Sequence, residues 1–246
     1  VACLEQVEAL PEVDQFIGCD LGLKQFLIPS SGKPVENPRY FRQTEKQLAR
    51  AQHQLSRMKK GSKNYLKQKV KVAKLHEKIS NQRKDFLQQE STRLIRENQI
   101  ICLEDLQVQN MIKNHKLAKS IQDAGWGEFK QMLRYKANWY GRILVTIDRF
   151  YPSTKRCSHC GNINPMITLD IRTWQCPVCK EIHDRDQNAA VNILNEGLEF
   201  LQPEKIMNRR NCGDSLWSSY KTSLMKARND EPGTSDWSRG ISRLQS

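Results

Sequence analysis

IDRFYPSTKRCSHCGNINPMITLDIRTWQCPVCKEIHDRDQNAAVNILNEGLEF, residues 147–200, contains two Cys-x-x-Cys pairs followed by an acidic segment that opens a helical pattern. Fifteen residues separate the two pairs, which are Cys157 with Cys160 and Cys176 with Cys179. This spacing is typical of a zinc ribbon, where two tight backbone turns each supply two thiolates to a tetrahedral ion. Disulfide bonds or a redox pair are the alternatives, but disulfides require an oxidising compartment. We therefore expect structural zinc at these four cysteines.

Two histidines lie close to the cysteines in the sequence. His159 falls inside the first pair, and His183 follows the second pair by four residues. Either imidazole is a possible zinc ligand. Because four thiolates already complete a tetrahedral set, we expect both histidines to be ordinary loop residues.

The composition indicates a polyanionic partner. The chain has 246 residues, a formal net charge of +13 and a pI near 9.4, which favours nucleic acid over a small acidic ligand. The first fifteen residues carry four acids and no basic segment, unlike a signal peptide. No apolar run approaches the ~20 residues of a membrane span. We expect a cytoplasmic protein without a membrane partner.

The first expected elements form a β-meander. The segment FIGCDLG, residues 16–22, has the apolar character of a buried strand. Two shorter apolar segments, at 26–28 and around Val35, flank a turn-rich link. Asp20 lies on the first and central strand, where a carboxylate is costly unless it is paired or binds a metal.

A basic helical hairpin is expected over residues 41–98. Thr44 and Gln47 have the spacing of a capping box at its start. Between Arg42 and Glu97 there are sixteen Lys or Arg residues against five Asp or Glu. A solubilising surface is one interpretation, but the one-sided excess favours a face that follows nucleic-acid phosphates. Apolar residues recur every seven positions in both arms: Phe41, Leu48 and Leu55, then Tyr65, Val72, Ile79 and Phe86.

Two acids end the next expected strand, IICL at residues 100–103. Side chains alternate along a strand, so only one of Glu104 and Asp105 can face the same centre as Asp20. We assign Glu104 to that centre and keep Asp105 as the solvent-facing or capping alternative. A helix at 125–140 and a strand at 144–147 are expected to follow.

Two further acids, Asp184 and Asp186, stand at the start of the last expected helix. An Asp at this place has a structural use as an N-cap, so one of the two can serve only that purpose. From residue 203 to 246 the hydrophobic periodicity is lost, and the composition indicates a disordered tail.

The order of these elements is that of the ribonuclease H-like (RuvC-like) α/β fold. Asp20, Glu104 and Asp186 lie where that fold gathers its acids. Such a cluster repels itself in the absence of cations. Its chemical use is to hold two Mg²⁺ ions about 4 Å apart for phosphodiester hydrolysis.

Seven segments resemble the TnpB family, transposon-encoded proteins related to the type V CRISPR nucleases. They are GCDLGLKQF, NPRYFR, KLHEKISNQRKDF, LEDL, DAGWGEF, DRFYPSTKRCSHCG and HDRDQNAAVNIL. The resemblance implies an RNA-guided DNA endonuclease, long labelled a transposase, with catalytic Mg²⁺, structural zinc and a guide RNA from the transposon end. It also implies that Asp20, Glu104 and Asp186 are the catalytic acids that bind Mg²⁺. Asp186 is preferred over Asp184 because the family's third acid directly precedes the x-N-A-A helix start.

The chain departs from the family pattern at its N-terminus. TnpB proteins carry an N-terminal lobe that binds the guide RNA and reads the motif beside the target, and we interpret residues 1–15 as a remnant of that region. The expected domains are a nuclease domain at 16–150, a zinc ribbon at 151–183, a final nuclease segment at 184–202 and a disordered tail at 203–246.

Three functions compete on the sequence. The intact acids favour a Mg²⁺-dependent DNA endonuclease core. The departure at the N-terminus favours a non-cleaving, zinc-ribbon nucleic-acid-binding protein that acts as a regulator or remnant. A transposase that joins DNA ends is the third, although no His-x-His pair supports a tyrosine-type mechanism.

Overall fold

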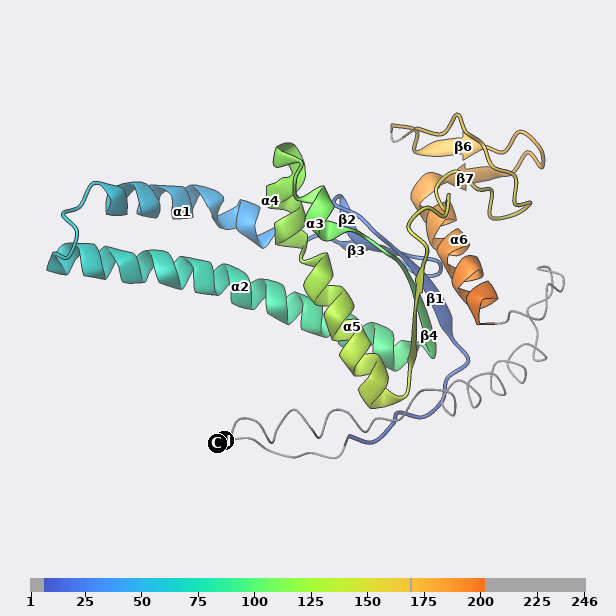
Figure 1. Ribbon diagram of the computed structural model, residues 1–246, viewed down its shortest axis with the longest axis horizontal. Helices are drawn as coiled ribbons and strands as arrows, with labels where there is room; N and C mark the ends of the chain where they lie inside the picture. The colour runs from blue at the N-terminus through green and yellow to red at the C-terminus, as the bar shows by residue number, and fades with distance from the viewer. Residues whose placement is uncertain (1–6, 169, 202–246) are drawn as a thin grey trace. The chain divides into compact units, whose positions relative to one another are not determined.

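The structure is a computed structural model that describes residues 7–168 and 170–201. A five-stranded sheet with the order β3-β2-β1-β4-β5 forms its centre (Figure 1). Neighbours among the first three strands are antiparallel, whereas β4 lies parallel to both β1 and β5. The predicted meander is present, with β1 as the central strand. The strands are β1 (Phe16–Leu21), β2 (Gln25–Pro29), β3 (Val35–Glu36), β4 (Ile100–Glu104) and β5 (Ile143–Ile147).

Two long antiparallel helices form the predicted hairpin (Figure 1). They are α1 (Tyr40–Ser56) and α2 (Lys63–Glu97). The turn between them contains Gly61 in the left-handed region with φ of 80°. Ser62 caps α2, because its side chain accepts a hydrogen bond from the backbone N–H of Tyr65 at 3.2 Å.

The predicted capping box of α1 is wrong. Thr44 lies inside the helix, which begins at Tyr40. A side chain from another helix caps the first turn instead. The carboxylate of Asp123, in α4 (His115–Ala124), accepts from the backbone N–H of Phe41 at 3.0 Å. This acceptor lies 82 residues away along the chain, so local spacing does not reveal it.

A buried lysine joins α2 to α5 (Trp126–Tyr140). The ammonium group of Lys136 donates to the backbone oxygen of Gln88 at 3.0 Å and to the hydroxyls of Ser91 and Thr92 at 2.7 Å each. These bonds satisfy the buried ammonium without a carboxylate. Between β4 and α5 the chain forms α3 (Val108–Met111) and α4, which the sequence pattern did not predict.

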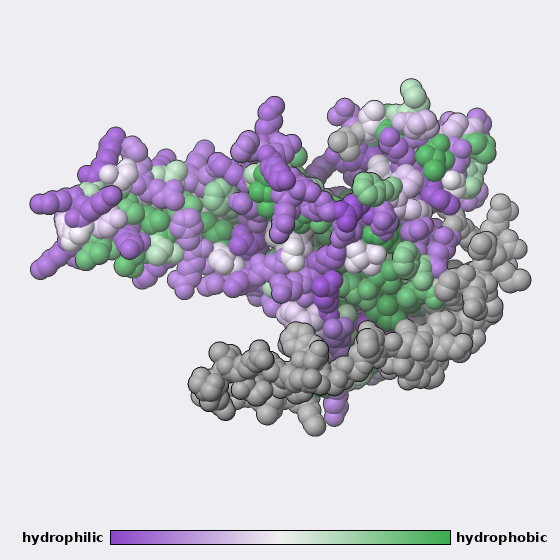
Figure 2. Space-filling view, viewed as in Figure 1, coloured by the Kyte–Doolittle hydropathy of each residue, from purple (hydrophilic) through white to green (hydrophobic). Residues whose placement is uncertain are grey.

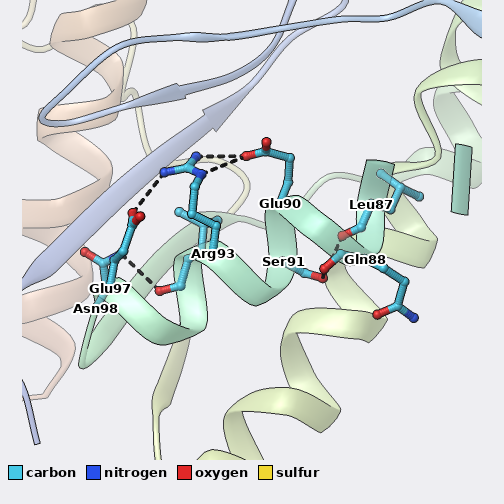
Figure 3. A network of polar contacts seen from close by, with 8 residues as sticks. Leu87, Gln88, Glu90, Ser91, Arg93, Glu97 and Asn98 are labelled. Carbon is cyan, nitrogen blue, oxygen red and sulfur yellow. Dashed lines mark hydrogen bonds and ion pairs between the residues drawn. The ribbon is translucent and has the colours of Figure 1, made fainter. Parts of the chain in front are cut away.

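A partly exposed side of the same α2 turns carries a small ion-pair network (Figure 3). Arg93 bonds Glu90 at 2.8 Å and Glu97 at 3.0 Å, three and four residues away. At the end of the helix, the side chain of Asn98 donates to the backbone oxygen of Leu94 at 3.0 Å. Side-chain contacts thus support this part of α2 on both sides.

Helices cover both faces of the sheet. On one face, Ile17 and Cys19 of β1 are buried in the main core with Leu87 of α2 and Phe129 of α5. The other face carries Gly18, which lies against α6 (Arg185–Phe200). These residues alternate along β1 as expected for a strand buried on both sides.

α6 lies unusually close to the sheet. A Cβ on Gly18 would lie 2.2 Å from the backbone oxygen of Ala190, and a Cβ on Gly197 would lie 2.4 Å from the Sγ of Cys102. Only glycine permits these approaches. α6 is therefore fixed against β1 and β4.

Residues 151–184, which we call the four-cysteine module, have a small core of their own. Two short antiparallel strands, β6 (Thr173–Gln175) and β7 (Ile182–Asp184), form its sheet. Ile167 and Trp174 are buried in it together with Cys157 and Cys176.

Arg142 ties the segment before β1 to the last turns of α2. This buried guanidinium donates to the backbone oxygens of Pro11 at 2.8 Å and Ile95 at 2.9 Å. The tail predicted at 203–246 lies outside the described residues. In the part of the chain that the structure describes, no helix has the length and apolar character that crossing a bilayer requires.

Candidate functional site

Two acids lie side by side at the carboxyl ends of β1 and β4. The parallel register pairs Cys19 with Leu103, so Asp20 and Glu104 occupy the next position on each strand. Alternation places both on the face of the sheet that α6 covers.

The third acid comes from the first turn of α6. Asp186 lies in this turn, and Asp184 precedes the helix. The carboxylate of Asp184 accepts from the backbone N–H groups of Asp186 at 3.1 Å and Gln187 at 2.9 Å. Asp184 is therefore the N-cap, which leaves the carboxylate of Asp186 available for another role.

Glu104 and Asp186 are close enough to Asp20 for their charges to act on it. Burial raises the pKa of Asp20 to about 7, and the negative charges of Glu104 and Asp186 act in the same direction. The positive charge of Arg185 opposes them. The structure thus places Glu104 and Asp186 within electrostatic range of Asp20, and a divalent cation would relieve the repulsion between such charges.

Two arginines balance the charge of Asp186. Arg172 bonds one carboxylate oxygen at 2.5 Å, and Arg185 bonds the other at 2.6 Å. Neither arginine was predicted from the sequence. Arg185 is adjacent to Asp186, but Arg172 lies fourteen residues earlier, and only the pairing of β6 with β7 brings it near.

Glu104 has a hydrogen-bond partner that the sequence did not predict. The hydroxyl of Ser153 donates to Oε1 of Glu104 at 2.5 Å. Ser153 lies between β5 and the first cysteine pair and is buried.

Asp105 does not join the acid cluster. Its carboxylate pairs with Lys130 of α5 at 2.8 Å and with Arg149 at 3.3 Å. The hydrogen bond from Lys130 holds the pKa of Asp105 below its usual value. The structure therefore places Glu104, and not Asp105, beside Asp20.

The four predicted cysteines converge. Their Sγ atoms all lie within 4.8 Å of one another, and two of the cross-pair distances are 3.6 Å. This spacing is far longer than the ~2.05 Å of a disulfide bond. It matches the ~3.8 Å that separates thiolates around a tetrahedral ion with Zn–S of about 2.3 Å. The donor set is compatible with zinc.

The expectation that His183 is a loop residue is wrong. His183 lies on β7, is buried, and contacts the Trp174 ring with a centroid distance of 4.9 Å. Its Nε2 lies 3.0 Å from the Sγ of Cys157. At this distance the imidazole can form a hydrogen bond with the Cys157 sulfur, and such a bond orients a metal ligand without itself binding the metal.

Two family models match the chain. The model described as "Probable transposase" matches residues 1–115, and the model described as "Cas12f1-like, TNB domain" matches residues 126–193. The second match includes the four cysteines and Asp186.

Relatives with assigned names agree with these models. A protein of Streptomyces pristinaespiralis named "Putative RNA-guided DNA endonuclease" is 45% identical over 196 residues, which cover 80% of this chain and 48% of the relative. The similarly named InsQ of Escherichia coli K12 is 35% identical, with coverages of 74% and 48%. A "TnpB-like protein" of Acanthamoeba polyphaga mimivirus is 31% identical, with coverages of 52% and 25%.

Solved structures share the fold. In a cryo-EM structure of a Cas12f1–sgRNA–target DNA complex, the protein superposes with a TM-score of 0.54 at 18% identity, covering 76% of this chain and 51% of that one. A CRISPR-Cas12f ternary complex gives a TM-score of 0.53 at 21% identity, with coverages of 76% and 40%.

The mixed α/β fold and the family models together define the class, which is that of the proteins described as probable transposases. The chain belongs to the TnpB family. It spans about half the length of the first two curated relatives that it matches.

Proposed function

We propose that this chain forms the RuvC-like, ribonuclease H-like centre of an RNA-guided DNA endonuclease. Asp20, Glu104 and Asp186 would hold Mg²⁺ and act as the catalytic acids. The observation that carries the proposal is the gathering of three carboxylates from separate elements, where burial and the charges of Glu104 and Asp186 together raise the pKa of Asp20 to about 7. A chain gains no stability from such a cluster, so a cation-binding role accounts for it better than a structural role.

Strand pairing and a helix cap position the three acids of the proposed centre. Parallel pairing of β1 and β4 sets Asp20 beside Glu104, and the Asp184 cap fixes the turn that carries Asp186. Bound Mg²⁺ would supply an activated water and would stabilise the leaving oxygen of the phosphodiester. The arginines on Asp186 balance its charge, and a cation at the cluster would compete with them.

The four cysteines are proposed to hold structural zinc within a zinc ribbon at 151–183. Cys157, Cys160, Cys176 and Cys179 would supply four thiolates. The ribbon stands between the nuclease domain at 16–150 and its final segment at 184–202. Zinc would supply stability to a module whose own apolar core is small.

Target DNA and a guide RNA from the transposon end are the proposed partners. The hairpin of α1 and α2 offers the positive surface for their phosphates, and a groove between its arms is lined by Arg50, Lys71 and Lys74. Figure 2 shows hydrophilic residues along much of the hairpin surface.

Cleavage of end-labelled single-stranded DNA by the purified full chain tests the proposal. We expect cutting that requires Mg²⁺ at low salt, where phosphate contacts are strongest. Asp20→Ala, Glu104→Gln and Asp186→Asn should each abolish cutting and leave DNA affinity nearly unchanged. Asp105→Asn is the matched control, since Asp105 neighbours the cluster but pairs with Lys130, and it should cut like the native chain.

Three other outcomes would contradict the proposal in whole or in part. Retained cutting by Asp20→Ala would remove Asp20 from the centre. A folded chain that binds DNA without cutting would support the non-cleaving regulator. On a supercoiled target, joined products in place of simple cuts would indicate a strand-transferring transposase.

A further inference from the structure

A short segment, residues 152–158, connects the acid cluster to the four-cysteine module. It begins five residues after β5 ends at Ile147 and includes the first cysteine, Cys157. Ser153 of this segment is only 3% exposed. Its hydroxyl donates to the Glu104 carboxylate at 2.5 Å, which is the short distance of a charge-assisted hydrogen bond. The segment therefore contacts the acid cluster directly.

Two asparagines of α6 hold the backbone of this segment. The amide of Asn192 donates to the backbone oxygens of Ser153 at 2.7 Å and Arg156 at 2.6 Å. The amide of Asn188 donates to the same oxygen of Arg156 at 2.7 Å and accepts from the backbone N–H of Ser158 at 2.9 Å. Both asparagines are 2% exposed. Buried amides that are bonded in this way specify one backbone conformation.

These hydrogen bonds connect Glu104 to the helix that carries Asp186. Asn188 and Asn192 lie on one face of α6, four residues apart. The same helix carries Asp186 in its first turn. α6 fixes the backbone of Ser153, and the hydroxyl of Ser153 fixes Glu104. The position of Glu104 relative to Asp186 is thus set through Ser153.

We infer that Ser153 is a positioning residue that holds the Glu104 carboxylate toward Asp20 and Asp186 and so sets the affinity of the acid cluster for a divalent cation. The inference rests on the proposed function. A glutamate side chain loses rotational freedom when it binds a metal, and a hydrogen bond made beforehand reduces that cost. Loss of a comparable partner to a metal ligand typically weakens metal affinity by about 10–100-fold.

Binding of Mn²⁺ to the zinc-loaded full chain, followed by the EPR signal of free Mn²⁺, tests the inference without cleavage. Thiolates select zinc over Mn²⁺, so the signal reports on carboxylates. We expect Ser153→Ala to bind Mn²⁺ about 10-fold or more weakly, with a melting temperature near that of the native chain, because the backbone bonds to Asn192 remain. Ser158→Ala is the control from the same segment, since Ser158 bonds Asn188 through its backbone, and it should bind Mn²⁺ normally.

Ser153→Cys provides a second variant that fills the same space with a weak donor, and it should also lose affinity. A double-mutant cycle separates positioning from a merely structural role. In a Glu104→Ala background, which removes the acceptor of the Ser153 hydroxyl, Ser153→Ala should cause no further loss. A folded Ser153→Ala or Ser153→Cys chain with native Mn²⁺ affinity would overturn the inference, as would an equal loss in the Glu104→Ala background.

The Asp20→Ala variant distinguishes failure of the inference from failure of the proposed function. If Mn²⁺ binding by the native chain does not depend on Asp20, both are overturned. If it depends on Asp20 but not on Ser153, only the role of Ser153 is overturned.

Discussion

Asp20 makes the metal-free protein less stable as the pH rises. Its pKa is about 7 in the folded chain and about 3.9 in an unfolded chain. Between these values the folded state binds more protons than the unfolded state, so the free energy of unfolding falls as the pH increases from about 4 to 7. A pKa difference of three units corresponds to about 4 kcal/mol in the free energy of unfolding.

Asp20→Asn should remove this pH dependence. In the absence of Mg²⁺, we expect the variant to melt at a higher temperature than the native chain at pH 8 and to lose that advantage at pH 5. Thermal unfolding followed by circular dichroism, with zinc present and Mg²⁺ omitted, measures the difference. Adding Mg²⁺ should stabilise the native chain more than the variant. If the variant and the native chain melted at the same temperature at pH 8, ionisation of Asp20 would not lower the stability of the folded chain.

The contact between α6 and the sheet depends on two glycines. Gly197→Ala would place a methyl group 2.4 Å from the Sγ of Cys102, and overpacking of this kind costs typically 1–3 kcal/mol. Gly127→Ala in α5 is the matched control, because a Cβ there meets nothing within 4 Å. Alanine should stabilise that helix by up to about 1 kcal/mol. Urea unfolding of both variants measures whether each change lowers or raises the free energy of unfolding. A Gly197→Ala variant with unchanged stability would mean that α6 can move away from β4.

The parts of the fold with local patterns were predictable from the sequence. Side-chain direction follows from position within one element. Alternation along β4 therefore predicted that Glu104, and not Asp105, faces Asp20, and the seven-residue spacing of apolar residues predicted the two helices of the hairpin. α3 and α4 were missed. α3 has only four residues and buries none of them, so it produces no apolar period.

Contacts between distant elements could not be predicted in this way. The cap of α1 by Asp123, the bond from Ser153 to Glu104 and the ion pair of Arg172 with Asp186 join residues 82, 49 and 14 positions apart. Each depends on how helices and strands meet after folding. The sequence pattern therefore predicted which acids gather, but not which side chains hold them.

The charge of the whole molecule is concentrated in one place. The hairpin carries an excess of eleven positive charges, nearly all of the net +13. Its basic side chains on α1 and α2 are mostly exposed. Like charges gathered on one protruding element repel each other. This cost is offset when a polyanion binds, because phosphate contacts release counterions from the nucleic acid.

Substitution of three basic residues in the groove between the hairpin arms should change the salt dependence of nucleic-acid binding. For Arg50→Gln, Lys71→Gln and Lys74→Gln combined, we expect weaker binding of labelled single-stranded DNA and a slope of log K against log[salt] that is shallower by about 2, since each lost phosphate contact contributes about 0.7. Fluorescence anisotropy without divalent cations measures the slope and avoids cleavage. The triple variant Lys33→Gln, Lys113→Gln and Lys116→Gln removes the same charge from exposed positions outside the hairpin and should leave the slope nearly native. Equal slopes for the two triple variants would mean that the hairpin charge acts only through the net charge and that its groove does not contact the phosphates.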